Sequence, residues 1–173
     1  MNCAVLPQLS YILQRDIAAV TELEQQLFES PWARDELVER LRRPSALSMA
    51  ARLARGGPIV GYVLWSLCVD VGCKTSEILR IGVAPEYRRQ GIGAALLSAP
   101  LARLRRRPVA EDCRVQIAVT DRDLAVHLFL KNNGFVAERI LPAHAADGSD
   151  SYMFVCRGRD SNHARHIRLN PGQ

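Results

Sequence analysis

The stretch VAPEYRRQGIGA, residues 83–94, joins an apolar strand to an amphipathic helix. Gly91 and Gly93 remove side chains at the point where backbone N–H groups must converge on an anion. The helix that follows adds the positive end of its dipole and its unpaired amides, which suit a phosphate group. Arg88 and Arg89 add positive charge at the rim. The segment therefore predicts a strand–loop–helix unit with a phosphate or pyrophosphate site.

Two well-known phosphate loops do not match this segment. A P-loop has the pattern GxxxxGK[ST], and no Lys-Ser or Lys-Thr follows Gly93. A Rossmann loop needs a third glycine where this chain has Leu96, and an acidic residue where the next strand ends in Val119-Thr120. The remaining interpretations are a diphosphate cradle of another kind and a glycine-rich turn without a ligand.

Hydrophobic periodicity on both sides of this segment predicts a sheet with helices packed on it. Strands are expected over 9–13, 46–53, 59–69, 75–83, 115–119, 135–141 and 151–156. Helices are expected over 16–27, from about 32 to 43, from 93 onward and over 123–132. Two helices after the first strand, and later strands that alternate with helices, indicate a mixed α/β or α+β fold.

Length and charge narrow the class of protein. A chain of 173 residues and 19.2 kDa favours one domain, placed at 1–156, followed by a basic, disordered tail at 157–173. That tail supplies +3 of the formal net charge of +5, so the remaining chain does not form a strongly basic nucleic-acid surface. Five cysteines without CxxC spacing favour reduced, buried thiols over a zinc site, and no metal is expected.

The chain is also expected to be cytoplasmic. Its longest apolar run, residues 58–69, is too short to span a bilayer, which takes about 20 apolar residues. Its first residues lack the basic region and long apolar stretch of a secretory signal. We therefore expect neither a membrane nor a nucleic acid as partner, and a monomer or homodimer.

Two motifs resemble those of a known superfamily. RRQGIGAAL, residues 88–96, resembles the acetyl-coenzyme A motif of the GNAT N-acetyltransferases, which follows a strand ending in V-x-P. DLAVHLFLKNNGF, residues 123–135, resembles the second motif of these enzymes. FESPW (28–32) and GSDSYM (148–153) are similar to segments of the ribosomal-protein-alanine acetyltransferase subfamily. The resemblance covers roughly residues 10–156.

The resemblance implies a GNAT-like fold with a mostly antiparallel sheet of six or seven strands and about four helices. A splayed parallel pair of strands would hold the pantetheine arm of acetyl-CoA, with backbone pairing at Ile81, Gly82 and Val83. The pyrophosphate would be held by the loop and the helix start, with a further cofactor contact at Asp123. The loop residues are Arg88, Arg89, Gln90, Gly91, Ile92, Gly93 and Ala94.

The implied activity is transfer of an acetyl group from acetyl-CoA to a primary amine by direct attack in a ternary complex. The subfamily resemblance points to a protein or peptide N-terminus as acceptor, with Pro31 and Trp32 in the substrate loop. Two alternatives remain. One is a non-catalytic acyl-CoA-binding module, and the other is an acetyltransferase that acts on a small amine.

Two acid–base positions of the family are apolar in this chain. The family's tyrosine falls at Leu130, and the glutamate of the ribosomal-protein subfamily falls at Ala118. Glu77 is therefore the candidate base, acting through water, although it is also consistent with a solvated carboxylate at a strand end. His127, or solvent, is the candidate donor to the leaving thiolate; the alternative is a surface histidine paired with Asp123.

Overall fold

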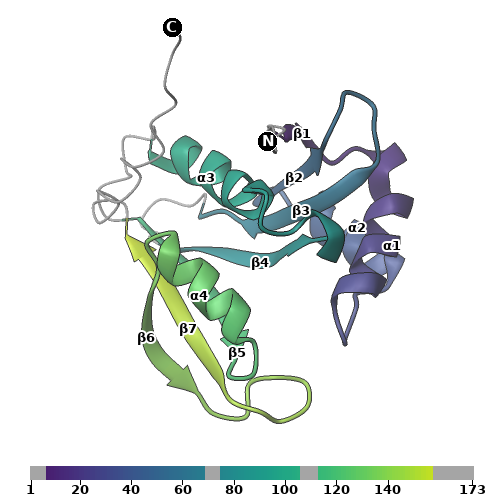
Figure 1. The fold of residues 1–173 in the computed structure, drawn as a ribbon. Coiled ribbons are helices and arrows are strands. Elements are labelled where there is room, and N and C mark those ends of the chain that lie inside the picture. Colours follow the sequence, from purple (N-terminus) through teal and green to yellow (C-terminus); the bar gives the residue numbers. More distant parts are fainter. Residues whose placement is uncertain (1–6, 69–74, 106–112, 158–173) are drawn as a thin grey trace, which may run out of the picture. The chain divides into compact units, whose positions relative to one another are not determined.

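The computed structural model describes residues 7–68, 75–105 and 113–157, with side chains through residue 102 in the second range. The chain divides into two compact units, residues 1–107 and 108–173. The described parts contain seven strands and four longer helices (Figure 1), which confirms the predicted α/β class. The tail was predicted to begin at residue 157, but Arg157 is the last residue of a strand, and residues 158–173 lie outside the described residues.

The first unit contains a four-stranded antiparallel sheet. Its neighbouring strands pair in chain order, β1 with β2, β2 with β3 and β3 with β4. The strands are β1 (Gln8–Tyr11), β2 (Ala46–Arg52), β3 (Ile59–Ser66) and β4 (Thr75–Val83). The helices are α1 (Ile17–Leu27), α2 (Arg34–Arg42) and α3 (Ile92–Arg105), with short 3-10 turns η1 (Gln14–Asp16) and η2 (Pro85–Tyr87).

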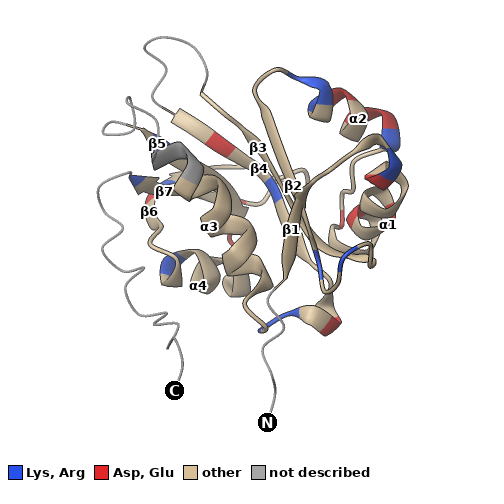
Figure 2. Ribbon diagram, turned by 90° about the horizontal axis from the view of Figure 1, so that it is seen from above, with Lys and Arg blue, Asp and Glu red and all other residues tan. Residues whose placement is uncertain are grey.

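Helices cover both faces of this sheet, α1 and α2 on one and α3 on the other (Figures 1 and 2). Successive residues of a strand point to opposite faces, as Tyr62 and Gly61 of β3 show. Tyr62 is fully buried in a core cluster with Val20, Leu23, Leu37 and Ala84. A side chain on Gly61 would instead meet Leu96 of α3, 3.2 Å away.

An irregularity in β4 decides which residues face α1 and α2. Leu64 of β3 pairs with Arg80, whereas the next residue, Trp65, pairs with Ile78, so Leu79 is an extra residue in β4. Arg80 consequently lies on the same face as Leu64 and Tyr62. Glu77, which pairs with Ser66, lies on that face as well. Figure 2 shows both charges on β4.

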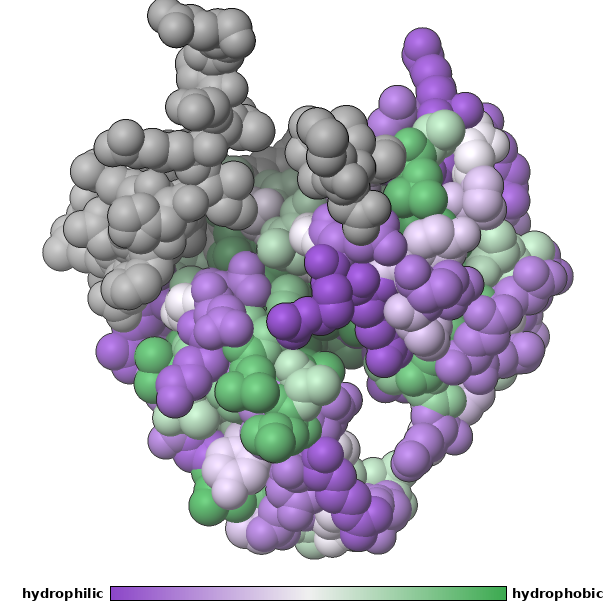
Figure 3. Space-filling view, viewed as in Figure 1, coloured by the Kyte–Doolittle hydropathy of each residue, from purple (hydrophilic) through white to green (hydrophobic). Residues whose placement is uncertain are grey.

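The second unit contains a three-stranded sheet of order β5-β7-β6 with antiparallel pairing. Its elements are β5 (Arg114–Thr120), α4 (Leu124–Asn132), β6 (Val136–Leu141) and β7 (Ser151–Arg157). The central strand β7 is mostly buried, and the edge strand β6 is mostly exposed. Apolar side chains also gather on the outer side of α4, where Leu124 and Leu128 are exposed (Figure 3).

Several predicted boundaries move by a few residues. The third strand ends at Ser66 rather than at residue 69, and residues 69–74 lie outside the described parts. Helix α3 begins at Ile92 and contains Pro100 in its interior. No helix in the described ranges is both long and apolar enough to cross a membrane. The splayed strand pair would join the two units and stays a prediction.

Candidate active site

The loop between β4 and α3 has the backbone of an anion site. Arg89 and Gly91 both have left-handed φ values, 61° and 81°, a backbone conformation that occurs in anion-binding turns. The first helical hydrogen bond runs from the Ala95 amide to the Gly91 carbonyl, at 3.0 Å. The amides of residues 92–94 therefore precede the helical bonding pattern and are available to a ligand.

The chemistry of this loop fits a diphosphate. A Cβ atom on Gly91 would meet nothing within 4 Å, so the loop is open on that side. The Arg88 and Arg89 side chains are exposed at the loop. Arg88 turns back, and its Nε donates to the Val83 carbonyl at 3.0 Å. Phosphate oxygens accept hydrogen bonds from the donors that this loop offers. These donors are backbone amides, a helix N-terminus and two guanidinium groups.

On the α1–α2 side, the segment from residue 28 to residue 32 lies against β4. We call residues 28–32 the acceptor loop, after the substrate role that the subfamily resemblance implies for Pro31 and Trp32. Pro31 is exposed, and Trp32 is half-buried. A Cβ atom on Gly82 would lie 2.5 Å from Leu27 Cδ1 and 3.4 Å from Phe28 Cζ. Gly82 thus lets the end of α1 and the start of this loop rest directly on the strand.

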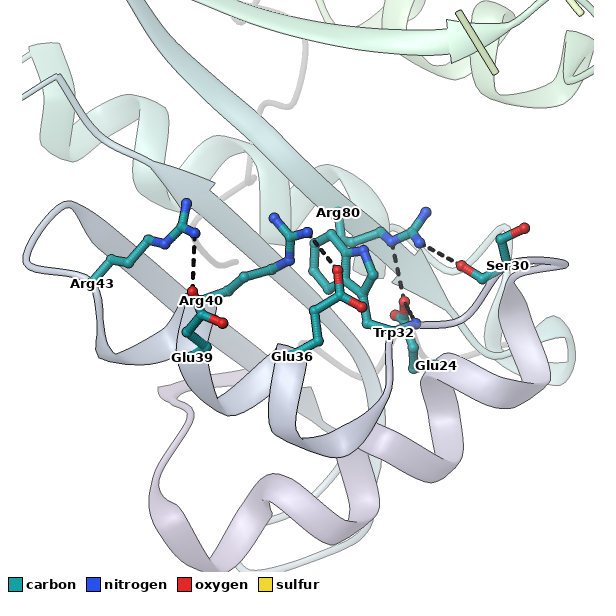
Figure 4. Close-up of polar contacts among 8 residues, drawn as sticks. All are labelled: Glu24, Ser30, Trp32, Glu36, Glu39, Arg40, Arg43 and Arg80. Atoms are coloured by element: carbon teal, nitrogen blue, oxygen red, sulfur yellow. Dashed lines mark hydrogen bonds and ion pairs between the residues drawn. The ribbon is translucent and has the colours of Figure 1, made fainter. Parts of the chain in front are cut away.

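A buried carboxylate ties the acceptor loop to α1 (Figure 4). Glu24 is 0% exposed, and its Oε1 accepts from the Trp32 backbone N–H at 3.1 Å. Its other carboxylate oxygen accepts a hydrogen bond from the Tyr62 hydroxyl. Oε1 also lies 3.1 Å from Nε of Arg80. Three groups from three separate segments therefore converge on one carboxylate.

Burial shifts the pKa values of both partners of this ion pair toward their neutral forms. Desolvation raises the pKa of Glu24 from 4.5, opposed by the Trp32 amide and by Arg80. Desolvation lowers the pKa of Arg80, opposed by its attraction to Glu24. The removal of both charges from water therefore outweighs their mutual attraction, as is common for buried pairs.

Arginines also stack on the aromatic rings of the acceptor loop. The Arg80 guanidinium lies 4.3 Å from the Phe28 ring centroid and 4.5 Å from that of Trp32. Arg40 of α2 lies 4.3 Å from the Trp32 ring and pairs with Glu36 at 2.6 Å. Each cation–π contact of this kind contributes about 0.5–1 kcal/mol at a partly exposed site.

In the second unit, the ring of His127 contacts the Thr120 carbonyl and not the predicted partner, the Asp123 carboxylate. Its ring Nε2 is 2.7 Å from the Thr120 carbonyl, at the end of β5. The ring also packs against Tyr152 and Phe154, with centroids 5.3 and 5.1 Å away. The Asp123 carboxylate caps α4 by accepting from the Val126 amide at 3.3 Å. The predicted pairing of His127 with the Asp123 carboxylate is therefore not the arrangement that the structure shows.

The remaining predicted residues take these places. Glu77 is half-buried on the α1–α2 face of β4, and Leu130 is 0% exposed in α4. Ala118 lies in β5 opposite Met153 of β7. Ile81, Gly82 and Val83 pair along one edge of β4 with residues 61–63 of β3. Their predicted pairing with the pantetheine arm would use the other edge of the strand and stays a prediction.

Comparison with known proteins assigns this chain to a family. The sequence model of the acetyltransferase (GNAT) family matches residues 17–135. The chain belongs to the GNAT acetyltransferase family. This confirms the predicted superfamily. It also places the glycine loop and the acceptor loop within the segment that the family shares.

Individual relatives agree with this assignment. An N-alpha-acetyltransferase from Sulfurisphaera tokodaii is 30% identical over 126 residues, which cover 68% of this chain and 73% of the relative. A putative ribosomal protein bS18-alanine N-acetyltransferase from Bacillus subtilis is 34% identical over 83 residues, 47% of this chain and 50% of the relative. Arabidopsis thaliana NAA60, solved with acetyl-CoA, shares the fold with a TM-score of 0.75 and 20% identity, over 88% of this chain and 99% of that one.

Sequence reasoning missed three residues of the buried cluster beside residues 28–32 in this GNAT acetyltransferase: Glu24, Tyr62 and Arg80. A signal for Glu24 was present, because it stands four residues after Val20 on the apolar stripe of its helix. A carboxylate at such a position needs buried partners. Arg80 is likewise a charged residue inside an apolar strand, which also indicates a buried partner. What the sequence lacks is the pairing between them, which depends on the extra residue in β4.

Proposed function

We propose that this protein is an N-alpha-acetyltransferase, which moves the acetyl group of acetyl-CoA to the α-amino group of a peptide or protein N-terminus. The observation that carries this acceptor is the match to the N-alpha-acetyltransferase from Sulfurisphaera tokodaii, which extends over two thirds of both chains. The glycine loop and the acceptor loop, built on β4 and at the end of α1, agree with it. A cytoplasmic location and a monomeric or dimeric state stay predictions.

In this proposal the chain holds the two substrates by separate elements. Backbone amides of residues 89–94 bind the pyrophosphate, with Arg88 at the rim and Asp123 near the cofactor. Acetyl-CoA supplies an acetyl thioester, whose carbonyl carbon is open to direct attack by an amine in a ternary complex. The acceptor loop, with Pro31 and Trp32, orients the acceptor amine, and this positioning is a large part of the catalysis.

Glu77 is the proposed general base. Its carboxylate takes the proton of the acceptor amine through a water molecule. Its place on the α1–α2 face of β4, on the same face as Arg80, supports this role. No group at positions 118 or 130 competes for it, because alanine and leucine carry no titratable atom.

Protonation of the leaving thiolate is proposed to come from solvent or from His127. The Nε2 atom of His127 faces the Thr120 carbonyl and acts there as donor. In the imidazolium form the other ring nitrogen, Nδ1, carries a proton that it can donate. This leaves one histidine nitrogen to orient the ring and the other for proton transfer.

A second candidate function, a non-catalytic acyl-CoA-binding module, is favoured by one observation. Leu130, at the position of the family's tyrosine, is completely buried and cannot supply a proton. Such a module would bind acetyl-CoA by the same glycine loop and transfer nothing.

Titration of the purified protein with acetyl-CoA in a calorimeter tests the shared step. We expect binding near one equivalent with micromolar affinity. Mass spectrometry of short peptides with free N-termini, in competition with polyamines and aminoglycosides, then tests the acceptor. Acetylated peptide supports the proposal, whereas preferential acetylation of a small amine or binding without transfer contradicts it.

A further inference from the structure

The side chain of Arg80 in β4 contacts the acceptor loop directly. Its guanidinium donates to the Ser30 carbonyl at 2.8 Å and stacks on the ring of Trp32 (Figure 4). It also stacks on the ring of Phe28. Its Nε lies against the Glu24 carboxylate, which in turn accepts from the Trp32 amide. One side chain thus contacts the start, the middle and the end of this loop.

The buried contacts at position 80 require an arginine side chain. Glu24 is 0% exposed and the Arg80 side chain 22% exposed, so the two charges depend on each other rather than on water. A guanidinium is planar and presents donors in several directions in that plane, so it can stack on rings while bonding a carboxylate and a carbonyl. A lysine ammonium has no plane to stack and cannot reproduce this set of contacts.

Arg80 also stands directly before Ile81, Gly82 and Val83, which form the predicted cofactor segment of the same strand. The side chain of Arg80 faces α1 and α2, whereas Ile81 faces the opposite side of the sheet. The contacts of Arg80 therefore act on the acceptor side and leave the glycine loop untouched.

We propose that Arg80 is a positioning residue, which clasps the acceptor loop onto β4 and thereby sets the affinity for the acceptor amine but not for acetyl-CoA. This inference rests on the proposed function, in which the acceptor loop receives the peptide N-terminus. Without the clasp, Phe28, Ser30 and Trp32 lose their shared anchor. The loop then samples several conformations, and acceptor binding must restrict it again, which weakens apparent affinity.

The test compares Arg80→Met with the double variant Glu24→Gln/Arg80→Met. Methionine keeps the length of the side chain and removes the charge and the donors. The double variant also removes the buried carboxylate that Arg80→Met leaves unpaired, so it decides the outcome if the single variant fails to fold. Arg43→Met is the matched control, because Arg43 pairs with Glu39 on the exposed side of α2.

We expect the acceptor-peptide KM to rise at least about tenfold in both Arg80 variants, with kcat changed less, which is the signature of lost acceptor binding. The dissociation constant of acetyl-CoA, measured by calorimetry, should stay unchanged, and Arg43→Met should match the wild type in both quantities. An unchanged acceptor KM, or an equal loss of acetyl-CoA affinity, overturns the proposal.

Hydrogen exchange gives a readout that does not depend on activity. The amides of residues 28–32 should exchange faster in both Arg80 variants than in the wild type and in Arg43→Met. If the wild type acetylates no peptide, the proposed function fails while this exchange measurement still tests the clasp. Unchanged exchange in residues 28–32 overturns the clasp even in an active enzyme.

Discussion

Leu27 fills the space that a side chain at Gly82 would need. A Cβ atom on Gly82 would lie 2.5 Å from Leu27 Cδ1. The neighbouring strand shows a different restriction, because a Cβ atom on Gly61 would lie 2.9 Å from the backbone oxygen of Gly82. The first obstacle is the end of a flexible side chain, and the second is the backbone of the paired strand β4.

These two glycines should therefore respond differently to substitution by alanine. In Gly82→Ala the Leu27 side chain can rotate away, whereas in Gly61→Ala the β3–β4 pair must shift. We expect Gly61→Ala to lower the free energy of unfolding by about 1–3 kcal/mol, as overpacking does, and Gly82→Ala to lower it less. Urea unfolding of both variants measures this. A larger loss in Gly82→Ala would contradict the packing described for β4.

The Glu24 carboxyl predicts a specific dependence of stability on pH. Burial raises its pKa from 4.5 in the folded protein, so between the two values the folded state binds more protons than the unfolded state. The contribution of this group is therefore fully present below the unfolded pKa and is lost as pH rises through the folded pKa. Glu24→Gln does not titrate, so the stability of the wild type relative to Glu24→Gln should fall as pH rises above 4.5.

Urea unfolding of the two proteins at a series of pH values measures this difference, and all other titratable groups are common to both. A relative stability of the wild type that increases with pH would mean that attraction to Arg80 outweighs burial. In that case the Glu24 pKa would be lowered rather than raised.

Gly91 and Gly56 form a matched pair for testing the glycine loop. Both have left-handed φ values, 81° and 76°, and a Cβ atom on either meets nothing within 4 Å. Replacement by leucine should cost about 1–2 kcal/mol of backbone strain at each position. Only Gly91→Leu should also lose acetyl-CoA affinity, by at least about tenfold, which corresponds to about 1.4 kcal/mol. Equal affinities in calorimetry would remove the loop from the cofactor site.

The local features of the molecule were predictable from the sequence, and its long-range pairings were not. The strand–loop–helix unit was read correctly because glycines, a preceding strand and a periodic helix are adjacent in the chain. His127 shows the limit of such reasoning. Its neighbour at helical spacing, Asp123, suggested a partner, but the carboxylate caps the helix and the ring turns to Thr120. Helix spacing allows both arrangements, and packing against β7 selects between them.

Arg80 shows a second limit. Simple alternation along β4 places Glu77 and Arg80 on opposite faces, because they are three residues apart. The extra residue at position 79 brings them to the same face. A bulge of this kind is decided by pairing with β3 and by packing. The residues of β4 alone therefore do not predict it.

The shared face of Glu77 and Arg80 leads to a test of the proposed base. Glu77→Gln keeps the size of the side chain, but the amide cannot accept the amine proton. We expect kcat to fall by about 10²-fold or more, within the range of general base catalysis. Glu22→Gln, an exposed position on α1, is the control for loss of a surface carboxylate in the same unit. Acetyl-CoA affinity should be unchanged in both variants, which separates loss of chemistry from loss of binding. A kcat for Glu77→Gln equal to that of the wild type would remove Glu77 from the mechanism.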